Sequence, residues 1–302
     1  MKHRIEYLLF AGIARVLRLF PLAAVRRIAR PFADAVFFVL PIRKRLTMGQ
    51  IAAAFPSRSR AWVRHTARAS YRNLVTTVFE LMWTPRLRGA EPETVLRMHE
   101  PDILLNAYRR GSGLILMSAH YGNWEWLSIL SARILGIPFT VIVHPLHNPH
   151  VDRLVESYRT MFGNRVVPMH SAGREAIRTL RNRGVVALLA DQSGPGSGLF
   201  VPFFGRPAAT FQGPAVFALR TGAPIVCGFC ERKPDGDYEV FLEEIPTSDL
   251  HGATEENVAE LTRRHVEAVE RRIAGNPGAW LWQHRRWKHA PPQTIGTRGG
   301  WS

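Results

Sequence analysis

Apolar residues in this chain follow two alternating patterns: short uninterrupted runs, and longer stretches with an apolar residue at every third or fourth position. The short runs predict buried strands at residues 114–117, 139–143, 185–190, 225–229 and 238–242. The longer stretches predict helices at residues 63–83, 102–110, 125–135, 151–162, 174–183, 214–221 and 254–274. Alternating strands and helices predict an α/β fold, a layered sandwich with a central mostly parallel or mixed sheet flanked by helices.

The first 40 residues are apolar but are repeatedly interrupted by arginine and proline. No uninterrupted apolar run approaches the ~20 residues that span a bilayer, and no cleavable small-residue site marks a secretory signal. At helical pitch, one sector of the wheel gathers Arg4, Arg15, Arg18, Arg26 and Arg30. An apolar face beside such a basic face predicts helices that lie in the interface of an anionic membrane. A pair of domain helices with a solvated basic side would have the same pattern.

These patterns divide the chain into three expected parts. Residues 1–42 are expected to form N-terminal amphipathic, membrane-associated helices, and residues 43–288 a single α/β domain. Residues 289–302 are expected to be a flexible C-terminal tail.

The charge is strongly basic, with a formal net charge of +16 and an isoelectric point near 11.1. Of the 40 basic residues only four are lysines, so a coding bias toward arginine is one explanation. A basic surface also suits anionic lipid headgroups, an acidic protein partner or nucleic acid. Nucleic acid is disfavoured because the chain has no zinc-finger spacing, no single-strand-binding aromatic signature and no dense basic helix.

The two cysteines, Cys227 and Cys230, lie on a predicted strand, where residues three apart point to opposite faces. We therefore expect two buried, unpaired thiols rather than a redox or metal pair, as suits a reducing compartment.

The candidate chemistry centres on His120 and Glu125, which follow the strand at 114–117 directly. Residues five apart on one helix point about 140° away from each other, so a working pair needs a break in the helix between them. Gly122 permits an unusual backbone angle and Asn123 is a good helix N-cap. This places His120 on a strand-to-helix turn and Glu125 in the first helical turn. A histidine oriented by a carboxylate suits removal of a proton from an alcohol that attacks an acyl group; the alternative is an ordinary capped turn with a core histidine.

Other candidates lie at the end of a strand or beside an apolar helix face. Asp191 follows the strand at 185–190, and carboxyl ends of strands gather functional residues, so Asp191 and His120 are expected near one cleft. Asp191 and Gln192 either shape an acceptor pocket, or Asp191 caps the following turn. Arg159 either reaches the cleft or solvates a helix edge.

The segment Phe203-Phe204-Gly205-Arg206 combines two aromatic rings with a cation. It either lines an acyl tunnel and meets a phosphate, or packs as a turn against the core. The residues Trp280, Trp282 and Trp287 are expected either to form an interfacial belt or to anchor the packing.

Three further readings are disfavoured. A metal site at His144, His147 and His150 lacks an obvious carboxylate partner in its proline-broken loop. The glycine-rich run at 194–198 lacks the lysine and hydroxyl of a P-loop. No Gly-x-Ser-x-Gly elbow is present, and neither cysteine has an activating setting. Direct transfer without a covalent enzyme intermediate is therefore favoured.

Four ordered blocks, found at residues 120–125, 147–159, 190–210 and 280–288, resemble those of a known family. They read His-Tyr-Gly-Asn-Trp-Glu; His147-Asn148-Pro149 with Arg159; Ala190-Asp191-Gln192 followed by Val-Pro-Phe-Phe-Gly-Arg-Pro-Ala-Ala-Thr; and Trp-Leu-Trp-Gln-His-Arg-Arg-Trp-Lys. The chain resembles the lipid A biosynthesis (lauroyl/myristoyl) acyltransferases, within the lysophospholipid acyltransferase superfamily, whose mark is a histidine and an acid separated by four residues.

The resemblance implies an O-acyltransferase in which His120, oriented by Glu125, is the catalytic base. The substrate-binding residues that it implies are Ser118, Tyr121, Gly122, Asn123, Arg159, Asp191, Gln192, Phe203, Phe204, Gly205 and Arg206. The implied donor is an acyl carrier protein (or coenzyme A) thioester, and the implied acceptor is a hydroxyacyl chain on a phosphorylated lipid A precursor. No metal, cofactor or nucleic acid is expected.

The expected location is the cytoplasmic face of the bacterial inner membrane, with peripheral or monotopic attachment to its anionic surface. A glycerolipid or phosphatidylinositol mannoside acceptor stays open, as does a non-catalytic membrane-binding relative.

Overall fold

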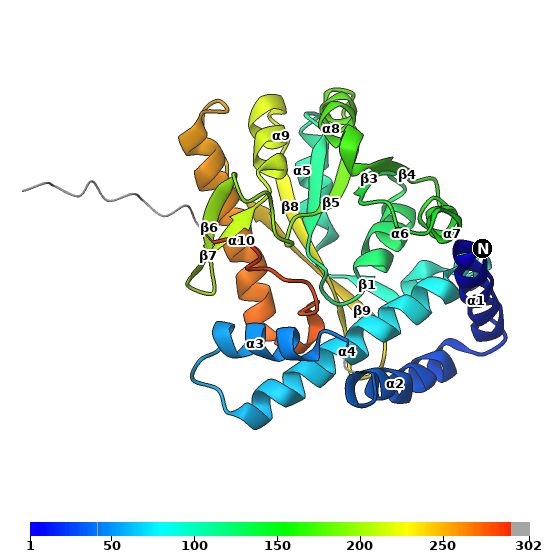
Figure 1. The fold of residues 1–302 in the computed structure, drawn as a ribbon. Helices are drawn as coiled ribbons and strands as arrows, with labels where there is room; N and C mark the ends of the chain where they lie inside the picture. The colour runs from blue at the N-terminus through cyan, green and yellow to red at the C-terminus, as the bar shows by residue number, and fades with distance from the viewer. Residues whose placement is uncertain (41, 291–302) are drawn as a thin grey trace, which may run out of the picture.

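The computed structural model describes residues 1–40 and 42–290, and within them a seven-stranded sheet forms the centre (Figure 1). Its order is β1-β9-β8-β2-β5-β3-β4. The strands are β1 (Leu96–Met98), β2 (Leu114–Ser118), β3 (Phe139–Val143), β4 (Arg165–Pro168), β5 (Val185–Leu189), β8 (Ile225–Arg232) and β9 (Tyr238–Ile245). All neighbouring pairs are parallel except β8 and β9. The expected α/β fold with a mostly parallel sheet is confirmed.

Helices cover both faces of this sheet. One face carries α8 (Ala172–Arg181), α9 (Gly213–Thr221) and α10 (Glu255–Gly275). The other carries α5 (Pro101–Arg109), α6 (Trp124–Leu135) and α7 (Pro149–Arg159). Because both faces are buried, the parallel strands read as continuous apolar runs rather than as alternating ones.

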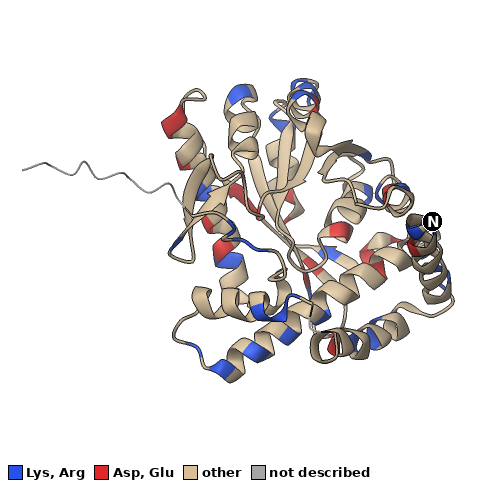
Figure 2. Ribbon diagram, viewed as in Figure 1, with Lys and Arg blue, Asp and Glu red and all other residues tan. Residues whose placement is uncertain are grey.

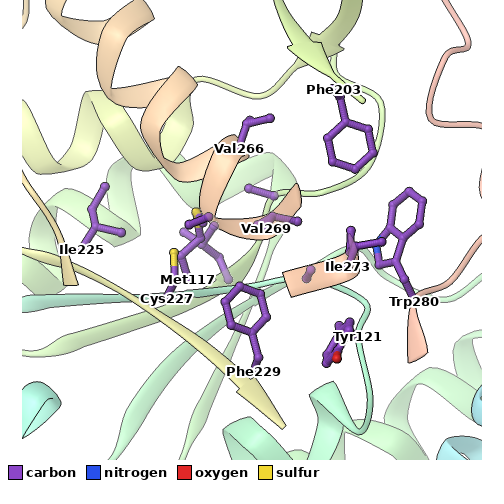
Figure 3. Close-up of a cluster of buried hydrophobic side chains, with 14 of the residues drawn as sticks. Met117, Tyr121, Phe203, Ile225, Cys227, Phe229, Val266, Val269, Ile273 and Trp280 are labelled. Atoms are coloured by element: carbon purple, nitrogen blue, oxygen red, sulfur yellow. The ribbon is translucent and has the colours of Figure 1, made fainter. Parts of the chain in front are cut away.

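The core between the sheet and α10 is drawn in Figure 3. Met117, Ile225 and Cys227 project from β2 and β8 toward Val266 and Val269 of α10. Cys227 lies in this core and Cys230 in the core on the other face, and both are free and buried. Burial raises the pKa of both thiols well above its ordinary value, so the expected pair of inert, unpaired thiols is confirmed.

Within the described residues, four α-helices precede the first strand: α1 (Lys2–Leu17), α2 (Leu22–Phe38), α3 (Lys44–Ala54) and α4 (Arg60–Trp83). The Ser59 side chain caps α4 by accepting a hydrogen bond from the Trp62 N–H. The long helix α4 packs against α2 and reaches the turn that follows β2, where Thr77 donates to the Gly122 carbonyl (Figure 1). It therefore supports the carboxyl end of the central strand.

The arginines of α1 and α2 do not form the single basic face that was expected. Arg18 turns inward to the Met82 carbonyl and the Tyr158 hydroxyl, and Arg26 turns inward to Glu80. Arg4, Arg15 and Arg30 stay exposed. The prediction of one basic face is wrong because the helical wheel ignores acceptors on other elements. The Met82 carbonyl and the buried Glu80 carboxylate draw Arg18 and Arg26 inward by accepting their hydrogen bonds.

The outer surface of α1 and α2 is instead rich in apolar side chains. Those exposed are Ile5, Leu8, Leu9, Ile13, Val16, Ile28, Phe32 and Phe38. Among residues 1–40 and 42–290, no helix has both the length and the hydropathy needed to cross a bilayer.

A two-stranded hairpin, β6 (Leu199–Phe203) and β7 (Arg206–Thr210), and four 3₁₀ segments complete the described fold: η1 (Thr84–Gly89), η2 (Pro92–Thr94), η3 (Met169–Ser171) and η4 (Pro277–Ala279). Trp280 and Trp282 are fully buried and in contact, so the packing reading of these two tryptophans is correct and the interfacial one is wrong. Of the expected tail at 289–302, residues 291–302 lie outside the described residues.

His265 of α10 gives the fold a pH-dependent term. It is buried, and its Nε2 has no hydrogen-bond partner within the described structure. Burial, with the nearby Arg286 charge second, lowers the pKa of His265 from 6.5 to about 3. The unfolded chain therefore binds this proton between about pH 6.5 and pH 3 and the folded protein does not, so the free energy of unfolding falls as the pH drops through that window.

Between pH 7 and pH 5 we expect His265 to lower the free energy of unfolding by about 2 kcal/mol. Below about pH 6.5 the unfolded chain binds one proton more than the folded protein, and each pH unit then lowers this free energy by ~1.4 kcal/mol. Urea unfolding of His265→Leu at both pH values should show a smaller loss than the wild type. The exposed His65→Leu is the matched control and should lose as much as the wild type. An equal loss in His265→Leu would contradict the assignment.

Candidate active site

The carboxyl ends of β2 and β5 bring His120 and Asp191 together. The two strands are parallel neighbours in which Ser118 pairs with Leu189, so each residue lies just beyond the end of its strand. The His120 Nδ1 lies 2.9 Å from Asp191 Oδ1, and the His120 backbone N–H donates to Asp191 Oδ2 at 2.9 Å. The expectation that the two residues share one cleft edge is confirmed.

The Asp191 carboxylate is buried but well supplied with donors. Trp280 Nε1 donates to its Oδ2 at 2.7 Å, beside the His120 backbone N–H. Burial alone would raise the pKa of Asp191, but the His120 ring and these hydrogen bonds lower it below its ordinary value. An ionised Asp191 accepts a hydrogen bond from the Nδ1–H group of His120, so the proton of the neutral ring stays on Nδ1 and Nε2 is the nitrogen that can accept a proton.

Glu125 lies in the same cavity but faces a different partner. It accepts a bidentate contact from Arg159, with Nε at 2.9 Å and Nη2 at 2.7 Å. Burial would raise the pKa of Glu125, but the Arg159 charge and hydrogen bonds lower it. The expected direct orientation of His120 by Glu125 is therefore corrected. The parallel pairing of β2 with β5 brings Asp191 to Nδ1 of His120, and the Glu125 carboxylate is bound by Arg159.

Two further side chains surround the His120 ring. Gln192 Nε2 lies 3.3 Å from His120 Nε2, and the Trp124 ring lies 5.3 Å from the imidazole ring, centre to centre. Gln192 therefore lies directly beside Nε2, the ring nitrogen of His120 that does not face Asp191.

A cavity of about 660 Å³ opens beside His120. Its polar rim contains His120, Glu125, Arg159 and Gln192. Its walls are otherwise mainly apolar, from β2, β3, β5 and α6, and they include Leu116, Leu127, Val141, Ile142, Ala187, Leu188 and Leu189. A mostly apolar cavity with a few convergent polar groups is the usual form of a small-molecule site.

The turn from β2 into α6 is held by backbone contacts that only glycine permits. Gly122 has φ +57°, and a Cβ added there would lie 1.7 Å from the Cys230 carbonyl oxygen. Its carbonyl accepts from Asn73 Nδ2 at 3.0 Å and Thr77 Oγ1 at 2.9 Å. Asn123 caps α6 by accepting from the Trp126 N–H. The expected strand-to-helix turn with Glu125 in the first helical turn is confirmed.

Several expected substrate-binding residues lie outside the cavity. Tyr121 is fully buried and donates to Glu231, and Gly122 and Asn123 shape the turn. Ser118, the last residue of β2, does line the cavity, although its hydroxyl donates to the Gly228 carbonyl.

The hairpin segment is also placed away from His120. Phe203 packs in the core against Trp280, and Phe204 packs against Phe55. Arg206 lies over the Trp287 ring, and Gly205 forms the hairpin turn at φ +67°. The reading of Phe203-Phe204-Gly205-Arg206 as an acyl tunnel is therefore wrong for this cavity, because none of the four residues lines it. Phe203 is buried in the core, and the partly buried Phe204 packs against that core.

The loop with His144, His147 and Asn148 forms part of the cavity rim and contacts α1. His144 and His147 line the cavity, and the His147 ring packs on the His3 ring of α1. Asn148 caps α7 and donates to the His3 carbonyl and to Glu6. Within the described residues, no three His, Cys, Asp or Glu side chains are arranged to hold a metal ion.

Sequence reasoning missed the roles of Trp280 and Trp124. Both lie inside the conspicuous blocks, but spacing alone does not show that Trp280, 89 residues beyond Asp191, donates to its carboxylate. The role of the buried Glu80 was also missed. Its carboxylate accepts a hydrogen bond from Asn123 Nδ2 at 2.9 Å and so stabilises the turn between β2 and α6.

A family model described as bacterial lipid A biosynthesis acyltransferase matches residues 1–289. The chain belongs to that family. The resemblance seen in the four sequence blocks is thereby confirmed.

Individual relatives of this acyltransferase-family chain carry two kinds of name. It is 28% identical over 191 residues to a phosphatidylinositol mannoside acyltransferase of Mycobacterium tuberculosis, covering 62% of this chain and 58% of the relative. It is 28% identical over 223 residues to a lipid A biosynthesis lauroyltransferase of Escherichia coli, covering 72% of this chain and 69% of the relative. The match thus covers less than two thirds of the mycobacterial relative.

Proposed function

We propose that this protein is a membrane-associated O-acyltransferase that moves a fatty acyl chain from an acyl thioester to a hydroxyl of a lipid A precursor. The observation that carries the proposal is the His120–Asp191 pair at the rim of a mostly apolar cavity, in a chain of this family.

The proposed step uses Nε2 of His120 as the base. It takes the proton of the acceptor hydroxyl, and the oxygen attacks the carbonyl carbon of the thioester. The tetrahedral intermediate then collapses, the carbon–sulfur bond breaks, and the leaving thiolate takes the proton from His120. Asp191 holds the ring and stabilises the imidazolium that forms between the two proton transfers.

Arg159 and Gln192 are proposed to bind the negatively charged groups of the reaction, namely a substrate phosphate and the oxyanion of the tetrahedral intermediate. Arg159 is held on Glu125 through Nε and Nη2, and both residues line the cavity. A cation fixed in this way suits a phosphate or the developing oxyanion, and the Gln192 amide adds a neutral donor next to His120. In this proposal Glu125 acts by positioning Arg159 and by adding negative charge near the imidazolium.

The acyl chain would occupy the apolar end of the cavity, between β2, β3 and β5. The net charge of +16 suits an acidic acyl carrier protein as donor, with coenzyme A thioester as the alternative.

The proposed membrane-contacting part is the expected N-terminal segment, residues 1–42. Its support is the row of exposed apolar side chains on α1 and α2, which burial in a lipid headgroup region would stabilise. The contact of α1 with the cavity rim through His3 and His147 would place the site near that surface. The proposed location is the cytoplasmic face of the bacterial inner membrane, with peripheral or monotopic attachment.

A phosphatidylinositol mannoside is the second candidate acceptor, because the mycobacterial relatives are named phosphatidylinositol mannoside acyltransferases. The His120–Asp191 pair would serve either hydroxyl.

Incubation of the purified protein with acyl thioesters and each acceptor, read out by mass spectrometry, tests the proposal. Addition of one acyl group to the lipid A precursor is the expected result, with carrier-protein and coenzyme A thioesters of several chain lengths compared as donors. Acylation of the mannoside alone would replace the first candidate by the second. Liposome binding without turnover of any thioester would contradict both and leave a non-catalytic membrane protein.

A further inference from the structure

We propose that a second cleft, behind the catalytic turn, binds a phosphate group. The cleft has a volume of about 590 Å³ and lies between α2, α4, the β8–β9 turn and η4. It is separate from the catalytic cavity, since no residue lines both. The proposal goes beyond acyl transfer, because the second cleft is not the cavity in which the acyl chain is proposed to bind.

The lining is basic. Four cationic side chains border the cleft, namely Arg30, Arg72, Arg232 and Lys233, against the single carboxylate of Glu231. Blue bands on α2 and α4 in Figure 2 show how strongly basic residues gather on these two helices. A concave surface lined by one sign of charge raises the local concentration of a counter-ion.

The Glu231 carboxylate is already occupied by donors. It accepts from Arg272 Nη2 at 2.5 Å, from Tyr121 at 2.8 Å and from Asn276 at 3.0 Å. Its negative charge is therefore largely compensated, and it opposes a bound anion less than a free carboxylate would.

Two of the arginines are held so that one nitrogen stays available. Arg72 uses Nε and Nη2 on Asp34, at 2.9 and 2.6 Å. Arg232 uses Nε on the Tyr238 hydroxyl and Nη2 on Glu80, at 2.8 and 3.0 Å. Within the described structure, Nη1 of neither residue makes a hydrogen bond to the protein, and neither atom is fully buried. A guanidinium fixed from behind loses little rotamer freedom when its remaining N–H groups bind a ligand, which favours binding.

Arg30 and Lys233 supply the more adaptable charges. Arg30 is exposed and, among residues 1–40 and 42–290, makes no ion pair. Lys233 contacts Glu239 at 2.9 Å through one of its three ammonium hydrogens. Two cations held by two or more contacts and two held by one contact or none match the several oxygens of a phosphate monoester or diester.

The phosphate has two sources, an anionic lipid headgroup and a free phosphate. Ile28 and Phe32 are exposed on α2, 41% and 53% accessible, and share one side of the helix because they lie four residues apart. Arg30 lies two residues from each of them and so points to the opposite side of α2, where it lines the cleft. The two sources are distinguished by experiment.

The cleft also shares a wall with the catalytic turn. Asn73 lines it and donates from Nδ2 to the Gly122 carbonyl at 3.0 Å and to the Ala279 carbonyl at 2.9 Å. Arg232 contacts Glu80, which in turn holds Asn123. A phosphate in the cleft would therefore bind to groups that support the turn carrying His120.

The test compares Arg30→Met/Lys233→Met with Arg181→Met/Arg220→Met. The second pair removes the same charge from exposed positions on α8 and α9, at the far end of the molecule from α2 (Figure 1). Isothermal titration at low salt uses two probes, inorganic phosphate and dihexanoyl phosphatidic acid below its micelle concentration. We expect at least about tenfold weaker binding in the first variant and a change within about twofold in the second.

The two probes separate the sources of the phosphate. Binding of the phosphatidic acid alone assigns the cleft to a lipid headgroup, and equal binding of both probes assigns it to phosphate itself. Arg30→Met alone, which disturbs no ion pair, should weaken binding about threefold and excludes misfolding as the cause.

Two results would overturn the proposal. One is a wild type that binds neither probe, and the other is an equal loss of affinity in both double variants, which would show a general charge effect. Acyl transfer is measured separately on the same preparations, so failure of the cleft and failure of the proposed reaction are distinguishable.

Discussion

Replacement of His120 by alanine is expected to lower the rate of acyl transfer by about 10³-fold, the middle of the range for loss of a general base. The ring lines the cavity with Nε2 toward Gln192, and no other imidazole occupies that place among the described residues. KM should change little, because the base contacts a proton that moves only in the transition state. Steady-state kinetics with the thioester and the acceptor give both constants.

The control is His144→Ala, which removes an exposed histidine from the rim of the same cavity. His144→Ala should keep the rate within about threefold of the wild type, since it removes a rim contact and leaves the proposed base, His120, in place. Circular dichroism and thermal unfolding of both variants show whether the fold is retained. A folded His120→Ala protein with wild-type turnover would remove the base from the mechanism.

The strands that flank the site were predictable because both faces of the sheet are covered. Apolar runs such as 114–117 and 185–190 therefore coincide with β2 and β5 within a residue. The short edge strands β1 and β4 were not predicted: Leu96–Met98 spans three residues, and Arg165–Pro168 begins with a charge and ends with proline. Strand β7 reads Arg-Pro-Ala-Ala-Thr, which has neither an apolar run nor alternation.

The partners of charged residues were the least predictable part of the site. Spacing placed Glu125 in the right helical turn, but the partner of His120 depends on which strand lies beside β2, and that is a property of the whole sheet. Arg18 and Arg26 were likewise assigned to an outer face, because their acceptors Met82 and Glu80 lie 64 and 54 residues away. Local periodicity carries no information about such distant contacts.

The second large effect is expected for Asp191→Asn. In the wild type, Oδ1 accepts from Nδ1 of His120, which leaves Nε2 free to take a proton. An asparagine of the same shape can present its amide N–H to Nδ1 instead, which favours the tautomer with the proton on Nε2 and removes the base. A comparable substitution in a serine-protease triad lowers kcat by about 10⁴, and we expect a loss of about 10³–10⁴ here.

Comparison with Glu125→Gln distinguishes the role of the Glu125 carboxylate from that of the Asp191 carboxylate. Glu125 is paired with Arg159 rather than with His120, so its loss leaves a buried arginine without its counter-charge. We expect the free energy of unfolding of Glu125→Gln to be about 3 kcal/mol lower than that of the wild type, as is usual when one partner of a buried ion pair is removed. Asp191→Asn keeps a side chain of the same shape at Nδ1 of His120 and should leave the free energy of unfolding less affected. Urea unfolding of the three proteins measures the difference.

A double-variant cycle decides whether Asp191 acts through His120. Combined with His120→Ala, Asp191→Asn should cost no further activity, because a base that is absent cannot be held in the wrong tautomer. Combined with His120→Ala, Glu125→Gln should still lower the residual rate, since the Glu125–Arg159 pair is proposed to act on the substrate's charge through Arg159. If the Asp191 substitution were fully additive and the Glu125 substitution silent in that background, Glu125 would be the acid that works through the histidine. The contact at Nδ1 would then have a structural role only.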